Sequence, residues 1–135
     1  MQSSYQDMCK EARENPAAFW EQVARDVVWI TPPQITLDDS TPPFYRWFVG
    51  GELNGCYNAV DRHVDAGRGE QTAIIYDSPV TDVIKHISYA DLQERIARLA
   101  GAIAAHGVGY GDRVIIYMPM IPEAIIAMLA CARIG

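Results

Sequence analysis

The sequence predicts an α/β fold, with N-terminal helices and an extended strap followed by an incomplete β-α-β unit of a larger doubly wound sheet. Two observations predict this order. Up to residue 68 the chain is irregular and rich in proline and aromatic residues, whereas strand and helix signals alternate from residue 69 onward. We therefore divide the 135 residues into an N-terminal region, 1–68, and the truncated start of a large domain, 69–135.

Helix signals open the chain. Ser4 and Asp7 have the spacing of a capping box and predict a polar helix that reaches Glu14. The pair Asn15-Pro16 then combines a preferred N-cap with a preferred first-turn residue. Apolar residues at helical spacing follow, so we expect a second, amphipathic helix that ends near Val27.

Prolines and aromatic residues dominate the next segment. Residues 29–43 hold four of the eight prolines, including two Pro-Pro pairs that favour extended backbone. Four aromatic residues then fall within 44–48. We interpret them as anchors that pin the strap to a neighbouring domain, in preference to an aromatic cage for a substrate.

A third helix is expected over residues 58–66, with Asn58 as its N-cap and Gly67 at its end. Within it, Asp61, Arg62 and His63 could resemble a catalytic cluster. Adjacent residues of a helix point in different directions, however, so ion pairing or solvation explains these side chains better.

The second region shows alternating strand and helix patterns. Residues 72–77 predict a strand that pairs with residues 84–87 as a hairpin. Ser88, with Asp91 as its box partner, begins a helix that ends at Gly107, and its apolar face comprises Leu92, Ile96, Leu99 and Ile103. The apolar run at 113–117 predicts a strand covered on both faces, and residues 122–134 predict an apolar helix that needs cover from a larger body.

Composition restricts the classes of function. Half of the residues are hydrophobic and 21% are charged, which is typical of a globular protein. The net charge of -6 and the scattered basic residues argue against nucleic acid as a partner. The longest apolar stretch, 124–132, is far shorter than the roughly 20 residues of a membrane span, so no membrane partner is expected.

The three cysteines, Cys9, Cys56 and Cys131, lack the spacing of a zinc site. Their odd number argues against a disulfide framework, and the acidic N-terminal residues argue against a secretory signal. A reducing compartment, the cytoplasm, is therefore expected.

Three motifs that could indicate a phosphate-binding, acid-base or metal site lack the structural context which such a site requires. The glycines at 107, 109 and 111 close a helix and lead into a strand, whereas a phosphate-binding glycine loop follows a strand and opens a helix. Asp38 and Asp39 have no recognisable acid-base partner, and Met118-Pro119-Met120 is a turn rather than a metal site. We assign no catalytic residue, no cofactor-binding residue and no metal ligand.

Long runs of the sequence resemble AMP-forming acetyl- and propionyl-CoA synthetases. These runs are residues 43–54, 56–64, 114–124 and 128–135. Residues 87–92 are similar to the first core motif of adenylate-forming enzymes, although Asp91 stands where Glu is commoner. Residues 75–81 look more like propionyl- than acetyl-CoA synthetases, so the resemblance favours propionate over acetate.

The resemblance implies a ligase that uses ATP, CoA and Mg²⁺. A carboxylate attacks the α-phosphorus of ATP to give an acyl-adenylate and pyrophosphate, and the CoA thiol then displaces AMP. The phosphate loop, acyl pocket and catalytic lysine of this family have no matching positions here. We therefore expect an N-terminal fragment, with residues 1–68 as a cap and 69–135 as the truncated start of the adenylate-forming domain, that is inactive and binds no cofactor alone.

The expected partner is the remainder of the synthetase chain. We also expect self-association through the apolar helix 122–134, because its uncovered side chains seek burial. Two alternatives remain open from the residues alone: a docking or interaction module without catalysis, and an independent small nucleotide-binding domain. The last is disfavoured because no glycine loop lies between a strand and a helix.

Overall fold

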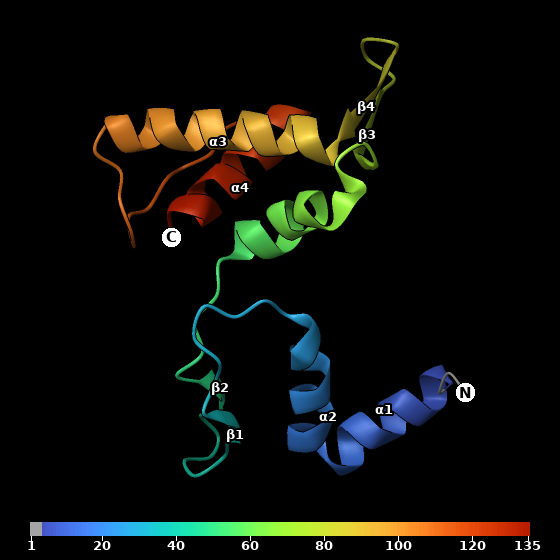
Figure 1. Cartoon of the computed structure of the whole chain (residues 1–135), viewed down its shortest axis with the longest axis vertical. Helices are drawn as coiled ribbons and strands as arrows, with labels where there is room; N and C mark the ends of the chain where they lie inside the picture. Colours follow the sequence, from blue (N-terminus) through green and yellow to red (C-terminus); the bar gives the residue numbers. More distant parts are fainter. Residues whose placement is uncertain (1–3) are drawn as a thin grey trace. The chain divides into compact units, whose positions relative to one another are not determined.

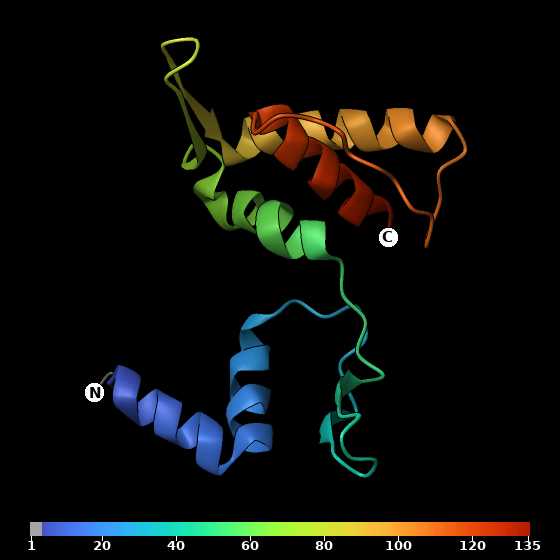
Figure 2. The same ribbon diagram turned by 180° about the vertical axis from the view of Figure 1, so that it is seen from behind.

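The computed structural model describes residues 4–135, and their contacts define two compact units that meet in the sequence between Leu53 and Asn54. Figures 1 and 2 show the elements of each unit from opposite sides. The contacts thus place the helical residues 55–68 with the second unit. The division at residue 68 into a cap and the start of a large domain stays a prediction.

Two capped helices begin the first unit. Helix α1 spans Tyr5–Glu14, and both hydrogen bonds of the predicted capping box between Ser4 and Asp7 are present. Helix α2 spans Pro16–Val23, and the side chain of Asn15 accepts a hydrogen bond from the N–H of Ala18. A 3₁₀ turn, η1, continues α2 over Ala24–Asp26, so the helix tightens before the predicted end at Val27.

The predicted extended segment contains paired strands from Ile35 onward, because the chain folds back on itself there. Strand β1, Ile35–Asp38, pairs antiparallel with β2, Arg46–Val49, and an isolated bridge joins Thr31 to Glu52. Asp38 lies at the turn, where hydrogen bonds from Ser40 and Arg46 lower its pKa to about 2. Strand pairing thus satisfies backbone groups that an isolated strap would leave to water.

The aromatic residues of 44–48 divide into two pairs. The rings of Trp47 and Trp20 lie 6.5 Å apart, and those of Phe48 and Trp29 lie 5.6 Å apart. Phe44 and Tyr45 are exposed. Trp47 and Phe48 thus contact other rings of their own unit, although Trp47 is itself 44% exposed. Anchoring to a neighbouring domain stays a prediction.

The second unit begins with helical residues 55–68, which include two π-helical turns, η2 over Tyr57–Asp61 and η3 over Val64–Arg68. The N-cap is Asn54 and not the predicted Asn58, because the side chain of Asn54 accepts a hydrogen bond of 2.9 Å from the N–H of Tyr57. Gly67 has φ +77, a backbone conformation that glycine adopts readily, and it kinks the last turn.

A hairpin and a long helix follow as predicted. Strands β3, Thr72–Ser78, and β4, Val83–Ser88, pair antiparallel. The side chain of Ser88 then caps α3, Tyr89–Ala105, by accepting a hydrogen bond from the N–H of Asp91. Gly107, with φ +89, follows the end of α3.

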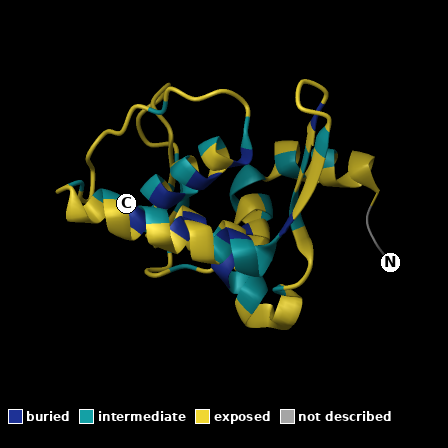
Figure 3. Cartoon of the chain, turned by 90° about the horizontal axis from the view of Figure 1, so that it is seen from above, coloured by how far each residue is buried: buried dark blue, intermediate teal, exposed yellow. Residues whose placement is uncertain are grey.

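Helix α4, Pro122–Ile134, packs against α3 and completes the core (Figures 1 and 2). The buried positions lie where the helices meet, as the dark blue segments of Figure 3 show. They form one cluster: Cys56, Val60, Ile87, Leu92, Ile96, Ala100, Ile126 and Ala130. Alanines at 100 and 130 allow the two helices to approach closely.

The predicted strand at 113–117 is not formed. Residues 113–118 lie outside every strand, and no backbone hydrogen bond joins them to another part of residues 4–135. Both strand pairs within the described residues are antiparallel, so the predicted β-α-β unit is absent from them. The apolar run was sufficient to predict a strand, but a strand also needs a neighbour for its ladder.

We predict that Gly51→Ala destabilises the first unit. A Cβ at this position would lie 2.8 Å from the Trp29 ring and 3.2 Å from the Cβ of Pro33. Overpacking of this kind costs about 1–3 kcal/mol. All three tryptophans lie in the first unit, so the urea transition monitored by tryptophan fluorescence reports the loss directly.

The matched control is Gly101→Ala in α3, where nothing lies within 4 Å of the added Cβ. This change leaves the fluorescence transition unchanged, and it stabilises the helix by about 0.5–1 kcal/mol. If Gly51→Ala unfolds at the same urea midpoint as the parent, the close packing of Trp29 and Pro33 around Gly51 would be contradicted.

Candidate functional site

The polar cluster of the second unit centres on Asp61. The Nη2 group of Arg133 donates hydrogen bonds of 2.6 and 2.7 Å to the two carboxylate oxygens of Asp61. Nε2 of Gln93 donates a third bond, of 2.8 Å, to Oδ1 of Asp61. The cluster therefore links the helical residues 55–68, α3 and α4.

Two further side chains extend this cluster. Nδ2 of Asn54 donates a hydrogen bond of 3.1 Å to the backbone carbonyl of Arg133, so the N-cap residue also binds the last turn of α4. The thiol of Cys56 is fully buried and lies 3.9 Å from Oδ2 of Asp61. Nε of Arg133 is buried and has no hydrogen-bond partner within the described residues, so Nη2 carries the contact with Asp61.

The protonation states of Asp61 and Cys56 indicate a structural role for the cluster. Burial alone would raise the pKa of Asp61, but the hydrogen bonds from Arg133 and Gln93 and the charge of Arg133 outweigh it, and the pKa is lowered. Burial raises the pKa of the Cys56 thiol, which keeps it protonated and unreactive at neutral pH. An ionised Asp61 that accepts three hydrogen bonds from Arg133 and Gln93, and a long fourth one from the Cys56 thiol, has little capacity left for proton transfer.

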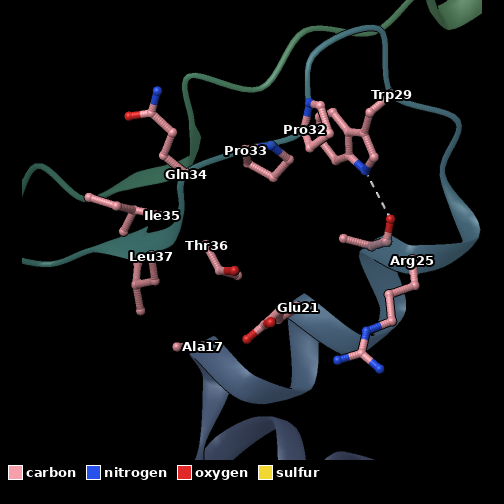
Figure 4. Close-up of a pocket in the computed structure, with 11 residues that line it drawn as sticks. Ala17, Glu21, Arg25, Trp29, Pro32, Pro33, Gln34, Ile35, Thr36 and Leu37 are labelled. Atoms are coloured by element: carbon pink, nitrogen blue, oxygen red, sulfur yellow. Dashed lines mark hydrogen bonds between the residues drawn. The ribbon is translucent and has the colours of Figure 1, made fainter.

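A hollow of about 450 Å³ lies in the first unit between α2 and residues 29–37 (Figure 4). Glu21 and Arg25 are the charged residues in its lining, and the remaining side chains are mostly apolar. The Trp29 indole N–H donates to the carbonyl of Ala24 at 2.9 Å and holds one wall in place. The lining contains neither a histidine nor a cysteine, and Glu21 is its one carboxylate, so a pair of carboxylates or a Cys–His pair is absent from it.

Residues singled out in the sequence have structural roles where the structure describes them. Ion pairing is confirmed for Asp61, although its partner Arg133 lies 72 positions away. The His63 ring lies 4.9 Å from that of Tyr89, and Arg68 contacts Nδ1 of His63. Asp38 pairs with Arg46. The contacts of Asp61, His63 and Asp38 are therefore ones that stabilise the fold.

Residues 4–135 contain no group of three or more His, Cys, Asp and Glu side chains placed to hold a metal ion. No helix of the described chain is long and apolar enough to cross a membrane.

Comparison with known proteins identifies the family to which this fold belongs. The family model described as the N-terminus of acetyl-coenzyme A synthetase matches residues 5–59, and the model described as AMP-binding enzyme matches residues 60–135. The chain belongs to the AMP-binding enzyme family. The resemblance to acetyl- and short-chain acyl-CoA synthetases that the sequence predicted is thereby confirmed.

Individual relatives agree with this assignment. The chain is 56% identical over 120 residues to the uncharacterized protein PA3568 of Pseudomonas aeruginosa, covering 89% of the chain and 19% of that protein. It is 54% identical over 121 residues to mitochondrial acyl-CoA synthetase short-chain family member 3 of Rattus norvegicus, covering 90% and 18%. Acetyl-coenzyme A synthetase of Mycolicibacterium smegmatis is 48% identical over 129 residues, covering 96% and 14%.

A solved structure shows the same fold. Acetoacetyl-CoA synthetase from Streptomyces lividans matches with a TM-score of 0.86 and 32% identity, covering 99% of this chain and 21% of that chain. This agreement confirms the α/β class of an acyl-CoA synthetase N-terminal region. The chain spans about a fifth of the length of the relatives that it matches.

We predict that Asp61→Asn destabilises the second unit by about 2–4 kcal/mol at pH 7, because it leaves Arg133 without its counter-charge. The side chains of Asp61 and Arg133 are 12% and 29% exposed, so water compensates the loss only in part. The measurement is urea unfolding by far-UV circular dichroism, with tryptophan fluorescence reporting the first unit separately. Glu94→Gln is the control, because the pair of Glu94 with Arg98 is exposed and contributes little.

The same pair predicts a pH dependence. Because the folded pKa of Asp61 lies below its unfolded value, its contribution is fully present above the unfolded pKa of about 3.9 and is lost as the pH falls through the folded pKa. The parent should therefore lose stability below about pH 4 more steeply than Asp61→Asn. If the parent and Asp61→Asn lose stability equally steeply as the pH falls, the stabilising contribution of ionised Asp61 would be contradicted.

Proposed function

We propose that this chain forms the N-terminal part of an AMP-forming short-chain acyl-CoA synthetase. The observation that carries the proposal is the identity of 54% over 121 residues with a short-chain acyl-CoA synthetase and of 48% over 129 residues with an acetyl-coenzyme A synthetase. The agreement of the fold with an acetoacetyl-CoA synthetase supports it. ATP and CoA are then substrates of the complete enzyme.

The proposed reaction has two steps. A carboxylate oxygen of the acid bonds to the α-phosphorus of ATP and pyrophosphate leaves; the sulfur of CoA then bonds to the acyl carbon and AMP leaves, while the thiol proton is released. Mg²⁺ would offset phosphate charge in the first step. The residues described here supply no group to either step, so their role is to fold and to support the parts that do.

We propose propionate rather than acetate as the preferred acid. Residues 75–81, which form the end of β3 and the hairpin turn, carry the resemblance to propionyl-CoA synthetases. The measurement is the ratio of kcat/KM for propionate and acetate in the complete enzyme. A higher kcat/KM with acetate would contradict this preference.

We also propose that residues 1–68 act as a cap and that 69–135 begin the adenylate-forming domain. The change of family model after residue 59 supports a boundary in this part of the chain. For location we propose the cytoplasm, which the three free cysteines support. Cell fractionation tests this location, and recovery in mitochondria, the location printed for the rat relative, would contradict it.

We predict that the 135-residue chain releases no pyrophosphate from ATP and propionate. Joined at the matching position to the remaining four-fifths or so of the Rattus norvegicus short-chain acyl-CoA synthetase, it should restore an activity within about tenfold of that of the rat enzyme. The rat enzyme measured in parallel is the positive control, and its remainder alone is the negative control.

Two outcomes would contradict the proposed function. Pyrophosphate release by the isolated chain would show that it holds an active site. A folded fusion without activity, beside the active rat enzyme, would favour the alternative of a docking module without catalysis.

A further inference from the structure

The asparagines of the chain differ in the residue that follows each of them. The three pairs are Asn15-Pro16, Asn54-Gly55 and Asn58-Ala59. Asparagine is thermolabile because the backbone nitrogen of the next residue can attack its side-chain carbonyl carbon and expel ammonia. Glycine leaves that nitrogen unhindered because it lacks a side chain, whereas proline has no N–H to lose. The sequence thus makes Asn54 the asparagine with the greatest tendency to deamidate.

The fold holds both ends of the Asn54 side chain. Its Oδ1 accepts a hydrogen bond of 2.9 Å from the N–H of Tyr57, and its Nδ2 donates one of 3.1 Å to the carbonyl of Arg133. Its backbone carbonyl accepts two more bonds, from the N–H and the Nδ2 of Asn58, at 3.2 and 3.1 Å. The start of the helical residues 55–68 therefore lies against the end of α4 (Figures 1 and 2).

These contacts oppose the reaction of Asn54 with its neighbour. Ring closure expels Nδ2 as ammonia, so the hydrogen bond to the Arg133 carbonyl cannot survive it. Gly55 is the first helical residue after the cap, and its nitrogen must leave the helical backbone geometry to reach Cγ of Asn54. Attack therefore needs a locally open conformation in which the helix start and α4 have separated.

We propose that Asn54-Gly55 is a site of spontaneous deamidation, and that the docking of α4 protects it. The nitrogen of Gly55 bonds to Cγ of Asn54 and gives its proton to water, while the amide nitrogen takes up a proton and leaves as ammonia. Water then opens the cyclic imide at either carbonyl, which yields aspartate or isoaspartate. Because the reaction consumes only water and changes no oxidation state, it is independent of the proposed synthetase activity.

The product cannot restore the contact with α4. An aspartate carboxylate accepts hydrogen bonds only, so it still caps the N–H of Tyr57 but has no donor for the Arg133 carbonyl. Its negative charge also lies beside the C-terminal end of α4, where the helix dipole disfavours it. Isoaspartate in addition lengthens the main chain by one methylene at the helix start. Deamidation therefore loosens the contact that had protected the site.

Peptide mapping tests the site and its protection. The chain is incubated at mildly alkaline pH with and without urea, and the mass of tryptic peptide 47–62 is followed with fragmentation to locate the change. The amide-to-acid mass gain should appear at Asn54, and at least about tenfold more slowly in the folded chain than in urea. Asn58 in the same peptide and Asn15 are internal controls.

Two outcomes of this experiment would overturn the proposal. An unchanged Asn54 in urea would show that the pair is not a deamidation site. A rate in the folded chain equal to or above that in urea would show that the fold does not protect it.

Substitutions separate the reacting nitrogen from the protecting helix. Gly55→Ala should slow the reaction in urea by about tenfold, because the methyl group hinders attack, and nothing lies within 4 Å of the added Cβ in the fold. Ile126→Ala removes a buried side chain of α4 and should accelerate the reaction in the folded chain by about tenfold or more. Met128→Ala, at a 62% exposed position of the same helix, is the matched control. Equal rates for the two α4 variants would overturn the role of α4.

Asn54→Asp reproduces one product and tests its effect. Hydrogen exchange at residues 131–134, the last turn of α4, should be about tenfold faster than in the parent, while the amide of Tyr57 stays protected. Asn15→Asp is the control, since Asn15 caps α2 in the other unit and its substitution should leave α4 unchanged. Unchanged exchange in α4 of Asn54→Asp would show that the contact with Arg133 contributes nothing to docking.

Discussion

The ion pair between Asp61 and Arg133 holds the second unit together. It joins side chains 72 positions apart in the sequence, and Gln93 from α3 completes the hydrogen bonding of the carboxylate. The apolar cluster beneath it has only eight buried residues, three of which are Ala or Cys. Because the core is this small, displacement of one helix would expose much of its buried area. The ion pair opposes such a displacement, because it fixes the position of α4 against the helical residues 55–68.

Asn54, next to this ion pair, satisfies backbone groups at the start of the helical residues 55–68 and at the end of α4. Asn54 caps the helix at 55–68 with its side-chain oxygen and binds the Arg133 carbonyl with its side-chain nitrogen. One side chain therefore satisfies groups at the start of one helix and at the end of another. The cluster resembles an active site in composition only, since its carboxylate is ionised and saturated and its thiol is buried.

Local features could be predicted from the sequence because short-range contacts determine them. The N-caps Ser4, Asn15 and Ser88 each bind a backbone N–H three residues ahead, and the hairpin of β3 and β4 joins neighbouring runs. Long-range features could not be predicted in this way. Asn54 was missed because Asn58 is an equally good cap by type, and the partner of Asp61 was missed because no spacing rule connects it to Arg133.

The apolar run at 113–117 shows a different limit. Its sequence favours a strand, whereas a ladder also needs a neighbouring strand. The family could be inferred because the resemblance extends over long runs of the sequence. The relatives are about five times as long as this chain, so most of their residues lie outside the region compared.

A double-mutant cycle on Asp61→Asn and Arg133→Gln tests the central interaction most directly. The free energy of unfolding of the second unit is measured for the parent, both single variants and the double variant. If the pair holds the unit together, the two changes couple by about 1–3 kcal/mol, and the double variant loses little more than either single one. Effects that add to within about 0.5 kcal/mol would show that the two side chains act independently and would contradict this account.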